Sequence, residues 1–314
     1  MKNIRIIFMG TPDFAIPSLE KILDAGYDVI AVITAPDKPA GRGMQLNQSA
    51  IKKIALLEGL KILQPEKLKN PEFIDELKNL EADLQVVVAF RMLPEIIWNM
   101  PPMGTINLHG SLLPQYRGAA PINWAIINGE KETGVTTFKL KHEIDTGDIL
   151  LQQKIEIGDT ETAGELHDRM KEIGAELLIQ TFDRLKENKL KEIPQHKIQR
   201  VSSYEMPLHR APKITSETCE INWNKNAEEI INLIRGLSPY PAAFTFLKEK
   251  KLKVFSAEKK IMQAKENCGE MITDHKSYLK FACSNGYILI KELQMEGKKK
   301  MNVEDFLRGW RRIS

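Results

Sequence analysis

Three apolar runs near the start of this chain constrain its fold more than any other feature. They are Ile4–Met9, Val29–Thr34 and Leu84–Ala89. Runs without polar alternation are typical of parallel strands that are buried on both faces of a sheet. The segments Ile16–Ala25 and Ser49–Glu58 between them have helical spacing, so strands and helices alternate. This order predicts an α/β fold with a doubly wound, Rossmann-like N-terminal domain.

The pattern changes after a long helix predicted over Thr162–Glu187. Residues 190–206 are polar and punctuated by proline, which is typical of a linker. One helix, Ala227–Leu237, is predicted beyond it, followed by the short strand-like runs Ala243–Leu247, Leu252–Ala257 and Tyr287–Leu293. We therefore expect a first domain over 1–189, a linker over 190–206 and a smaller C-terminal β-barrel domain, OB-like in type, over 207–314.

Charge is distributed unevenly between the two parts of the chain. Residues 1–206 carry 25 Lys/Arg against 29 Asp/Glu, whereas residues 207–314 carry 20 against 13, a net charge of +7. A basic C-terminal part predicts a module that faces an anionic partner. A lysine-rich solvated surface explains the same charge equally well.

The composition excludes several classes of protein. A hydrophobic content of 42% and a charged content of 28% fit an ordinary folded chain. No apolar run approaches the roughly 20 residues of a membrane helix, and the apolar start is too short for a signal peptide. The cysteines Cys219, Cys268 and Cys283 are far apart, which predicts neither a disulfide framework nor a metal site. We expect a cytoplasmic monomer without a bound metal or a membrane association.

Two polar side chains stand at the end of a strand predicted over Thr105–Leu108. Asn107 and His109 are two residues apart, so both point to one side of a strand. Ligands of open α/β sheets bind beyond the carboxyl ends of the strands. Downstream, Asp145 lies in a turn between strands predicted over 135–140 and 149–157, where an Asx-turn is the alternative role. Each residue alone is more often structural, and only their combination predicts a reaction site.

The segment Pro36–Gln48 is a further candidate. It contains two prolines, two glycines, Lys38 and Arg42, which predicts neither helix nor strand. Its length of about 13 residues exceeds the usual 2–6 of a strand-to-helix connection. The segment is therefore predicted to be a functional insert, with a flexible connection as the alternative.

The strand-end motif resembles that of the folate-dependent formyltransferases, whose pattern reads VNxHxSLLPxxRG and, further on, DxGDI. The matching residues are Asn107, His109, Ser111, Leu112, Leu113, Pro114, Arg117, Gly118, Asp145, Gly147, Asp148 and Ile149. Other segments are similar to the branch of this family that acts on methionyl-tRNA: 6–15, 34–43, 118–122 and 235–243. The resemblance covers nearly the whole chain.

This resemblance implies transfer of a formyl group from 10-formyltetrahydrofolate to the free amine of methionyl initiator tRNA. Asn107, His109 and Asp145 would be catalytic: Asn107 would stabilise an oxyanion, His109 would donate a hydrogen bond or move a proton, and Asp145 would orient His109. The expected folate-binding residues are Ser111, Leu112, Leu113, Pro114, Met92 and Leu93. The expected tRNA-binding residues are Lys38, Gly41, Arg42, Lys298, Lys299 and Lys300.

The chain departs from the family pattern at one place that bears on folate. Relatives typically read VAYGxxLP, whereas residues 88–94 read VAFRMLP and are one residue shorter. In the family this loop lines the pterin pocket, so the folate contacts of Met92 and Leu93 depend on how the shorter loop folds.

Three other functions stay open from the sequence. A nicotinamide-dependent Rossmann enzyme would need a GxGxxG turn, and Met9–Phe14 has none. A formyltransferase acting on a small amine, such as a nucleotide sugar or a purine precursor, would keep the catalytic residues and leave the basic C-terminal part unexplained. A non-enzymatic RNA-binding protein would explain that part and leave Asn107, His109 and Asp145 without a role.

Overall fold

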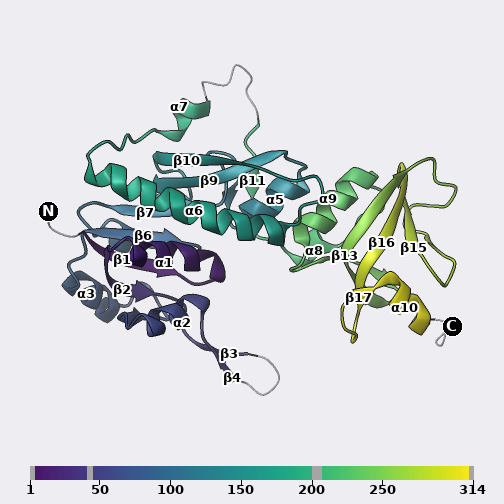
Figure 1. Cartoon of the computed structure of the whole chain (residues 1–314), viewed down its shortest axis with the longest axis horizontal. Helices are drawn as coiled ribbons and strands as arrows, with labels where there is room; N and C mark the ends of the chain where they lie inside the picture. Colours follow the sequence, from purple (N-terminus) through teal and green to yellow (C-terminus); the bar gives the residue numbers. More distant parts are fainter. Residues whose placement is uncertain (1–3, 41–44, 200–206, 311–314) are drawn as a thin grey trace. The chain divides into compact units, whose positions relative to one another are not determined.

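The computed structural model describes residues 4–40, 45–199 and 207–310, and the chain folds into two compact units (Figure 1). The first unit comprises residues 1–118, 134–155 and 167–209, and the second comprises residues 119–133, 156–166 and 210–314. Two short segments of the predicted first domain, 119–133 and 156–166, therefore fold with the C-terminal part. The predicted domain bounds of 1–189, 190–206 and 207–314 stay a prediction.

The first unit contains a seven-stranded sheet in the order β10-β9-β7-β6-β1-β2-β5. Its strands are β1 (Arg5–Gly10), β2 (Asp28–Ile33), β5 (Ile62–Leu63), β6 (Leu84–Val88), β7 (Thr105–His109), β9 (Glu132–Lys139) and β10 (Ile149–Glu156). The pairs β1–β2, β1–β6, β2–β5 and β6–β7 are parallel, whereas β9 is antiparallel to β7. The predicted Rossmann-like parallel sheet is confirmed, with an antiparallel extension at one edge.

Helices cover both faces of this sheet. They are α1 (Ile16–Asp24), α2 (Ala50–Leu57), α3 (Pro71–Asn79), α4 (Glu95–Trp98) and most of α6 (Ala163–Lys186), with a 3-10 turn at Asp13–Ala15. The short helix α7 (Gln195–Gln199) lies beyond the edge strand β10 (Figure 1). On one face, Phe73 and Leu77 of α3 pack with Met9 and Val87 of the sheet. On the other face lies α6 (Figure 1). The strands are thus buried on both sides, as their unbroken apolar runs predict.

A short ribbon and one further small strand complete the first unit. The strands β3 (Lys38–Ala40) and β4 (Gln45–Asn47) pair antiparallel, and β8 (Arg117–Gly118) follows β7. The prediction that Pro36–Gln48 is neither helix nor strand is therefore wrong at its two flanks. A strand pair can form here because Pro39 removes only one backbone donor from a two-stranded, open ribbon.

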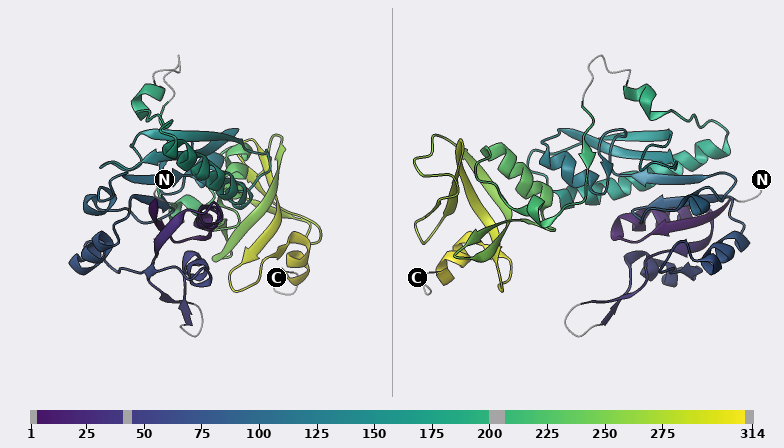
Figure 2. Two further views of the ribbon diagram at one scale, coloured as in Figure 1. Left: turned by 60° about the vertical axis from the view of Figure 1, so that its left-hand side comes forward. Right: turned by 180° about the vertical axis from the view of Figure 1, so that it is seen from behind.

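The second unit is built around a curved antiparallel sheet in the order β12-β13-β16-β15-β14, with β17 paired to β16. Its elements are α5 (Pro121–Ile127), β11 (Arg210–Ala211), α8 (Ser216–Cys219), α9 (Ala227–Leu237), β12 (Ala243–Leu247), β13 (Lys250–Ile261), β14 (Met271–Thr273), β15 (Leu279–Cys283), β16 (Gly286–Met295), β17 (Met301–Asn302) and α10 (Val303–Trp310). Register shifts in β13 near Ser256 bend the long strands β13 and β16, green to yellow in Figure 2. The predicted C-terminal β-barrel is thus confirmed in the form of a half-barrel.

Helix α9 fills the concave side of this half-barrel. A capping box of Asn226 and Glu229 starts the helix, because each side chain accepts a hydrogen bond from the other residue's backbone N–H. Ile230, Ile234 and Leu237 are buried in the core of the unit. No helix of the described residues in either unit is long and apolar enough to cross a membrane.

Arg235 is a charged side chain that this core buries. Its guanidinium donates to the carbonyl oxygens of Gly158 and Glu161 at 3.1 and 3.2 Å, and to Asn232 Oδ1 at 2.9 Å. These bonds tie the segment 156–166 to α9 within the second unit. Arg235 lies in one of the segments that resemble the tRNA-acting family branch, and its contacts give it a structural role.

We expect Arg235→Met to lower the free energy of unfolding by about 2–4 kcal/mol, because it removes the three hydrogen bonds that the buried guanidinium donates. Arg308→Met is the matched control: Arg308 is exposed and, within the described residues, pairs only with Asp305, so its loss should change stability by less than about 0.5 kcal/mol. Urea denaturation of both variants measures the difference. Equal stability of the two variants would show that the buried contacts of Arg235 contribute nothing.

Candidate active site

The candidate site is built on β7, whose side chains alternate between the two faces of the sheet. Leu108 faces α6, where Gly174 allows a close approach: a Cβ at that glycine would lie 2.9 Å from Leu108 Cδ2. Asn107 and His109 therefore point to the opposite face. Asn107 pairs with Val87 of β6 and Phe138 of β9, so it lies between neighbouring strands on both sides. The strand thus presents the amide and the imidazole together, as predicted.

The Asn107 side chain is half-buried at the end of β7. Among the residues that the structure describes, no group forms a hydrogen bond with its amide. A buried or half-buried amide normally finds a partner, so an unpaired one at a strand end is suited to a bound ligand. The amide is free to donate to a group that enters the site.

His109 is buried and its ring is fixed on three sides. The Nε2 atom lies 2.9 Å from the carbonyl oxygen of Tyr116, and because a carbonyl only accepts, Nε2 donates. The rings of Phe138 and His109 are perpendicular, with centroids 6.4 Å apart. The Nδ1 atom lies 3.9 Å from Asp145 Oδ2, an ion-pair distance longer than a hydrogen bond. Asp145 thus faces the free nitrogen of His109.

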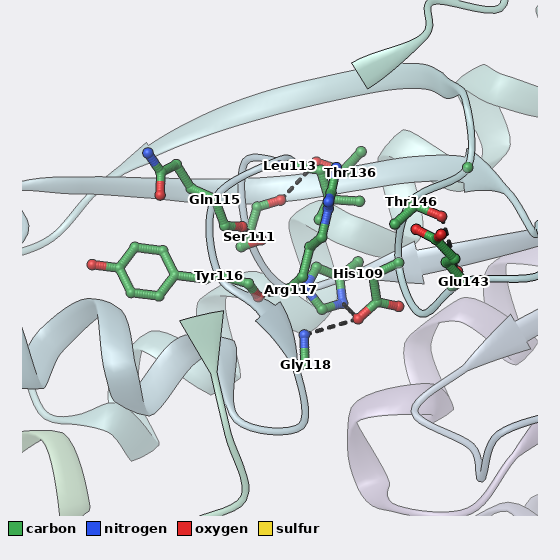
Figure 3. A network of polar contacts seen from close by, with 12 residues as sticks. His109, Ser111, Leu113, Gln115, Tyr116, Arg117, Gly118, Thr136, Glu143 and Thr146 are labelled. Carbon is green, nitrogen blue, oxygen red and sulfur yellow. Dashed lines mark hydrogen bonds and ion pairs between the residues drawn. The ribbon is translucent and has the colours of Figure 1, made fainter. Parts of the chain in front are cut away.

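Asp145 reaches His109 through a fold-back of the chain. Strand β9 ends at Lys139, which pairs with Ile106 near the start of β7, so the segment 141–148 has to turn back to approach His109. Asp145 has a left-handed backbone conformation (φ 54°), and its Oδ2 accepts the Gly118 N–H at 2.9 Å (Figure 3). The carboxylate therefore bridges the end of β7 and the loop that follows it.

Gly147 allows this fold-back. A Cβ at this position would lie 1.6 Å from the backbone oxygen of Lys139, so only glycine fits. The next residue holds the segment in place, because the Lys139 N–H donates to the carbonyl oxygen of Asp148 at 3.0 Å. The DxGDI pattern is thus explained locally by a close approach of two backbones.

The loop after β7 is held by side chains rather than by regular structure. Thr136 donates to the Ser111 carbonyl at 2.6 Å and accepts from the Leu113 N–H at 3.2 Å (Figure 3). Gln152 donates to the Leu113 carbonyl and to Thr136, both at 2.9 Å. The Ser111 hydroxyl donates to the Gln115 carbonyl at 2.6 Å. Side-chain hydrogen bonds thus hold this loop in one conformation.

The residues predicted to bind folate differ in how far their side chains are available. Ser111, Leu113 and Pro114 are buried, and Leu113 packs with Phe138 and Ile149. Leu112 is half-buried. Met92 is 74% exposed, whereas Leu93 is buried beside α4. Leu112 and Met92 can thus offer side-chain surface, and the others contribute mainly through the backbone they fix.

The shortened loop around Met92 is anchored by Arg91. Its guanidinium donates to the Glu66 carbonyl at 2.9 Å and also to the Pro65 carbonyl, and it lies over the Phe90 ring. Burial lowers the pKa of Arg91. Arg91, which lies in the segment that departs from the family pattern, therefore anchors this loop.

The predicted tRNA-binding residues fall in two places. Lys38 is exposed on β3, while Gly41 and Arg42 lie outside the described residues. At the base of the ribbon, Asp37 accepts from Lys52 at 2.5 Å and from Gln64 at 2.9 Å, and these hydrogen bonds hold the pKa of Asp37 below its usual value. The base of the insert is thus braced against α2, which contradicts a purely flexible connection.

The second place is the turn that joins β16 to β17 in the second unit. Lys298, Lys299 and Lys300 are adjacent there, and Lys300 pairs with Glu292 at 2.7 Å. All three lysines are exposed. The three residues form a basic turn on the C-terminal half-barrel.

One group of possible metal ligands occurs in the described residues, at Asp13, His167 and Asp168. Asp168 already binds the ammonium of Lys171 at 2.9 Å. Hydrogen bonds from Lys171 and then His167 lower the pKa of Asp168. The Lys171 ammonium thus already neutralises one of the two carboxylates of this group. The expectation of a metal-free protein stays a prediction.

Comparison with known proteins identifies the chain. The family model described as "Formyl transferase" matches residues 2–182, and that of the formyl transferase C-terminal domain matches residues 213–311. A methionyl-tRNA formyltransferase of Parabacteroides distasonis is 51% identical, over 100% of this chain and 98% of its own length. One from Phocaeicola vulgatus is 53% identical, over 99% and 97%. The chain belongs to the methionyl-tRNA formyltransferase family.

Solved structures agree with this formyltransferase fold. The sugar 3N-formyl transferase WlaRD, solved in the presence of dTDP and 5-N-formyl-THF, superimposes with a TM-score of 0.67. The match covers 95% of this chain and 100% of that one, at 23% identity. At this identity the likeness concerns the fold.

One residue of the formyltransferase site could not be recognised from the sequence. Gln195 lies in the stretch predicted to be a linker, yet it is only 3% exposed and contacts both loops of the site. Its polar, aperiodic surroundings gave no signal of burial, because the contacts that bury it come from distant parts of the chain.

Gly147→Ala should lower kcat of this formyltransferase by about 10²-fold, because relieving the clash with Lys139 displaces Asp145 by the order of an ångström. Gly309→Ala is the matched control, since a Cβ there meets nothing within 4 Å. Steady-state kinetics of both variants measures the effect. Wild-type kcat in Gly147→Ala would mean that the position of the fold-back does not matter to the reaction.

Proposed function

We propose that this protein transfers the formyl group of 10-formyltetrahydrofolate to the α-amine of methionine on initiator tRNA. The observation that carries the proposal is the identity of about half with methionyl-tRNA formyltransferases over the whole chain, the basic C-terminal part included. Such a product starts protein synthesis, so we place the reaction in the cytoplasm. We expect the protein to act as a monomer.

The chemistry consists of one acyl transfer. The amine nitrogen attacks the formyl carbon, and the carbonyl oxygen becomes an oxyanion in the tetrahedral intermediate. The bond from that carbon to N10 then breaks, N10 takes up a proton, and the former amine loses one. The site has to stabilise the oxyanion and to move these protons.

Asn107 is the proposed oxyanion donor. Its amide is half-buried at the strand end and has no partner among the described residues, so it is available without first breaking a hydrogen bond. A donor that is fixed in advance stabilises developing charge most effectively, because it does not reorganise during the reaction. The neighbouring strands β6 and β9 provide this fixation.

His109 and Asp145 are proposed to act as a pair. The imidazole donates through Nε2 to Tyr116, so a proton gained in the reaction would reside on Nδ1, opposite the Asp145 carboxylate 3.9 Å away. The carboxylate would attract the imidazolium that forms in the reaction. The pair can therefore take up a proton from the attacking amine and release it to N10, directly or through a water.

The formyl donor is proposed to lie against the loop after β7 and the loop around Met92. Ser111, Leu113 and Pro114 would contribute backbone groups to the folate pterin, and Leu112, Met92 and Leu93 would contribute apolar contact. The hydrogen bonds of Thr136 and Gln152 hold the first loop in one conformation. Such rigidity lowers the entropy cost of binding.

The tRNA is proposed to contact two regions of the chain. Lys38, Gly41 and Arg42 of the insert would approach the end that carries the methionine, where a guanidinium can form directional hydrogen bonds to phosphate or base. Lys298, Lys299 and Lys300 would bind the backbone by neutralising phosphates, which makes affinity dependent on salt but not on sequence.

A formyltransferase acting on a nucleotide sugar or a purine precursor is the second candidate. The fold likeness to the sugar 3N-formyl transferase favours it, because that likeness extends over 95% of this chain. It leaves the net charge of +7 of residues 207–314 without a function.

An assay with 10-formyltetrahydrofolate separates the two candidates. We expect formylation of methionyl initiator tRNA with a kcat/KM well above that for charged elongator tRNA, and a fall in activity as salt increases. A dTDP-linked amino sugar serves as the alternative acceptor. Formylation of the sugar without formylation of either tRNA would reject the proposed function in favour of the second candidate.

We expect Asn107→Ala to lower kcat by ~10²–10³-fold, or about 2.7–4 kcal/mol, which is typical of losing one oxyanion donor. The KM for folate should change much less, because the charge exists only in the transition state. Asn79→Ala, at an exposed asparagine that ends α3, is the control. An unchanged kcat together with a large loss of folate affinity would rule out the oxyanion role.

The proposed pairing of His109 and Asp145 predicts strong non-additivity. The losses in kcat/KM of His109→Ala and Asp145→Asn should not add in the double mutant, because either change alone already breaks the pair. Kinetics of the two single variants and the double variant measure the coupling. Fully additive losses would mean that the two residues act independently.

A further inference from the structure

Gln195 is a buried polar residue that the proposed reaction does not use. It is the first residue of α7, in the segment that follows α6, and its side chain is 3% exposed. Two contacts fix this segment on the first unit: Ile193 and Ile149 exchange backbone hydrogen bonds at 2.9 Å, and Ile198 packs against Leu113 and its neighbours. The position of Gln195 is therefore determined by the fold on both sides of it.

The amide of Gln195 uses both its donors and its acceptor. The Nε2 atom donates to the carbonyl oxygens of Asp145 and Gly147, each at 2.8 Å. The Oε1 atom accepts from Arg117 Nε at 3.0 Å and from Arg117 Nη2 at 2.5 Å. One side chain thus joins the fold-back segment to the loop that follows β7.

These contacts surround the Asp145 carboxylate. The two carbonyls that Gln195 holds lie at Asp145 itself and two residues further on, so they fix the backbone from which the carboxylate projects. Arg117, held by the same amide, is followed directly by Gly118, whose N–H binds Asp145 Oδ2. Gln195 therefore binds the backbone of Asp145 directly, and it binds Arg117, the residue before the Gly118 N–H that holds the Asp145 carboxylate.

We infer that Gln195 is a positioning residue for formyl transfer, which acts by holding Asp145 opposite His109. The inference rests on the proposed function for its kinetic consequence. Gln195 touches no reacting atom. It acts through the two hydrogen bonds that its Nε2 donates to the carbonyl oxygens of Asp145 and Gly147. A carboxylate at this position would keep the bond to Arg117 but would face two carbonyl oxygens with lone pairs, so a glutamine is needed.

Two variants separate the donors from the acceptor. Gln195→Met keeps a side chain of similar length and removes all four hydrogen bonds, whereas Gln195→Glu keeps the acceptor for Arg117. Both should lower kcat ~10- to 100-fold, as expected when a reacting group is displaced by about 1 Å, with KM for folate and tRNA within about threefold of wild type. Gln153→Met, at an exposed glutamine of β10, is the matched control and should keep wild-type kcat.

A cycle with Asp145 tests whether Gln195 acts through that residue. In an Asp145→Asn background, Gln195→Met should cost less than about threefold in kcat, because the positioned charge is already gone. A full additional loss would overturn the inference, and so would a loss expressed mainly in KM. Wild-type kcat in Gln195→Glu would also overturn it, since the donors would then be dispensable.

Amide hydrogen exchange of the free protein tests the same inference without the reaction. Gln195→Met and Gln195→Glu should accelerate exchange of the Gly118 N–H at least about tenfold and leave core amides such as those of Val86 and Ile106 unchanged. Unchanged exchange at Gly118, or equal acceleration at Val86 and Ile106, would show only a structural role. Selective acceleration in a protein that formylates no tRNA would reject the proposed function and keep the positioning role.

Discussion

The fold-back of residues 141–148 is the constraint on which the rest of the site depends. Strand β9 runs antiparallel to β7 and ends opposite Ile106, so its continuation would leave the site without a carboxylate. The missing Cβ of Gly147 lets the chain pass against the backbone of Lys139. Asp145 can then meet the Gly118 N–H and His109 from a distant part of the sequence.

The polar groups of the site divide into engaged and available ones. His109, Asp145 and the loop after β7 have hydrogen bonds or ion pairs within the protein, whereas the Asn107 amide has none among the described residues. An acyl-transfer site requires this division. The groups that support the site stay fixed, and the Asn107 amide remains available to bind the oxyanion that forms in the transition state. The energy of fixing the site is thus supplied by folding and not by substrate binding.

The sequence predicts the central parts of the fold better than its edges. Buried strands such as β6 and amphipathic helices such as α9 follow directly from residue periodicity, because burial on known faces determines both. The helix start Asn70-Pro71 is readable from its capping residues, although no helix was predicted there. The ribbon β3–β4 and the burial of Gln195 depend on contacts between distant residues, which a local pattern does not contain. At the site, the placement of Asn107 and His109 on one face of β7 is predictable from their spacing, whereas the route by which Asp145 reaches His109 is not.

Binding of the formyl oxygen by Asn107 at the end of β7 is the contact on which the proposed reaction depends. A crystal structure with a stable 10-formyl folate analogue, whose formyl group cannot be transferred, tests this contact directly. We expect the formyl oxygen about 2.7–3.1 Å from Asn107 Nδ2, on the face of the sheet opposite α6 and beside His109. An analogue bound with its formyl group out of hydrogen-bond reach of Asn107, or on the α6 face, would contradict the proposed role of Asn107.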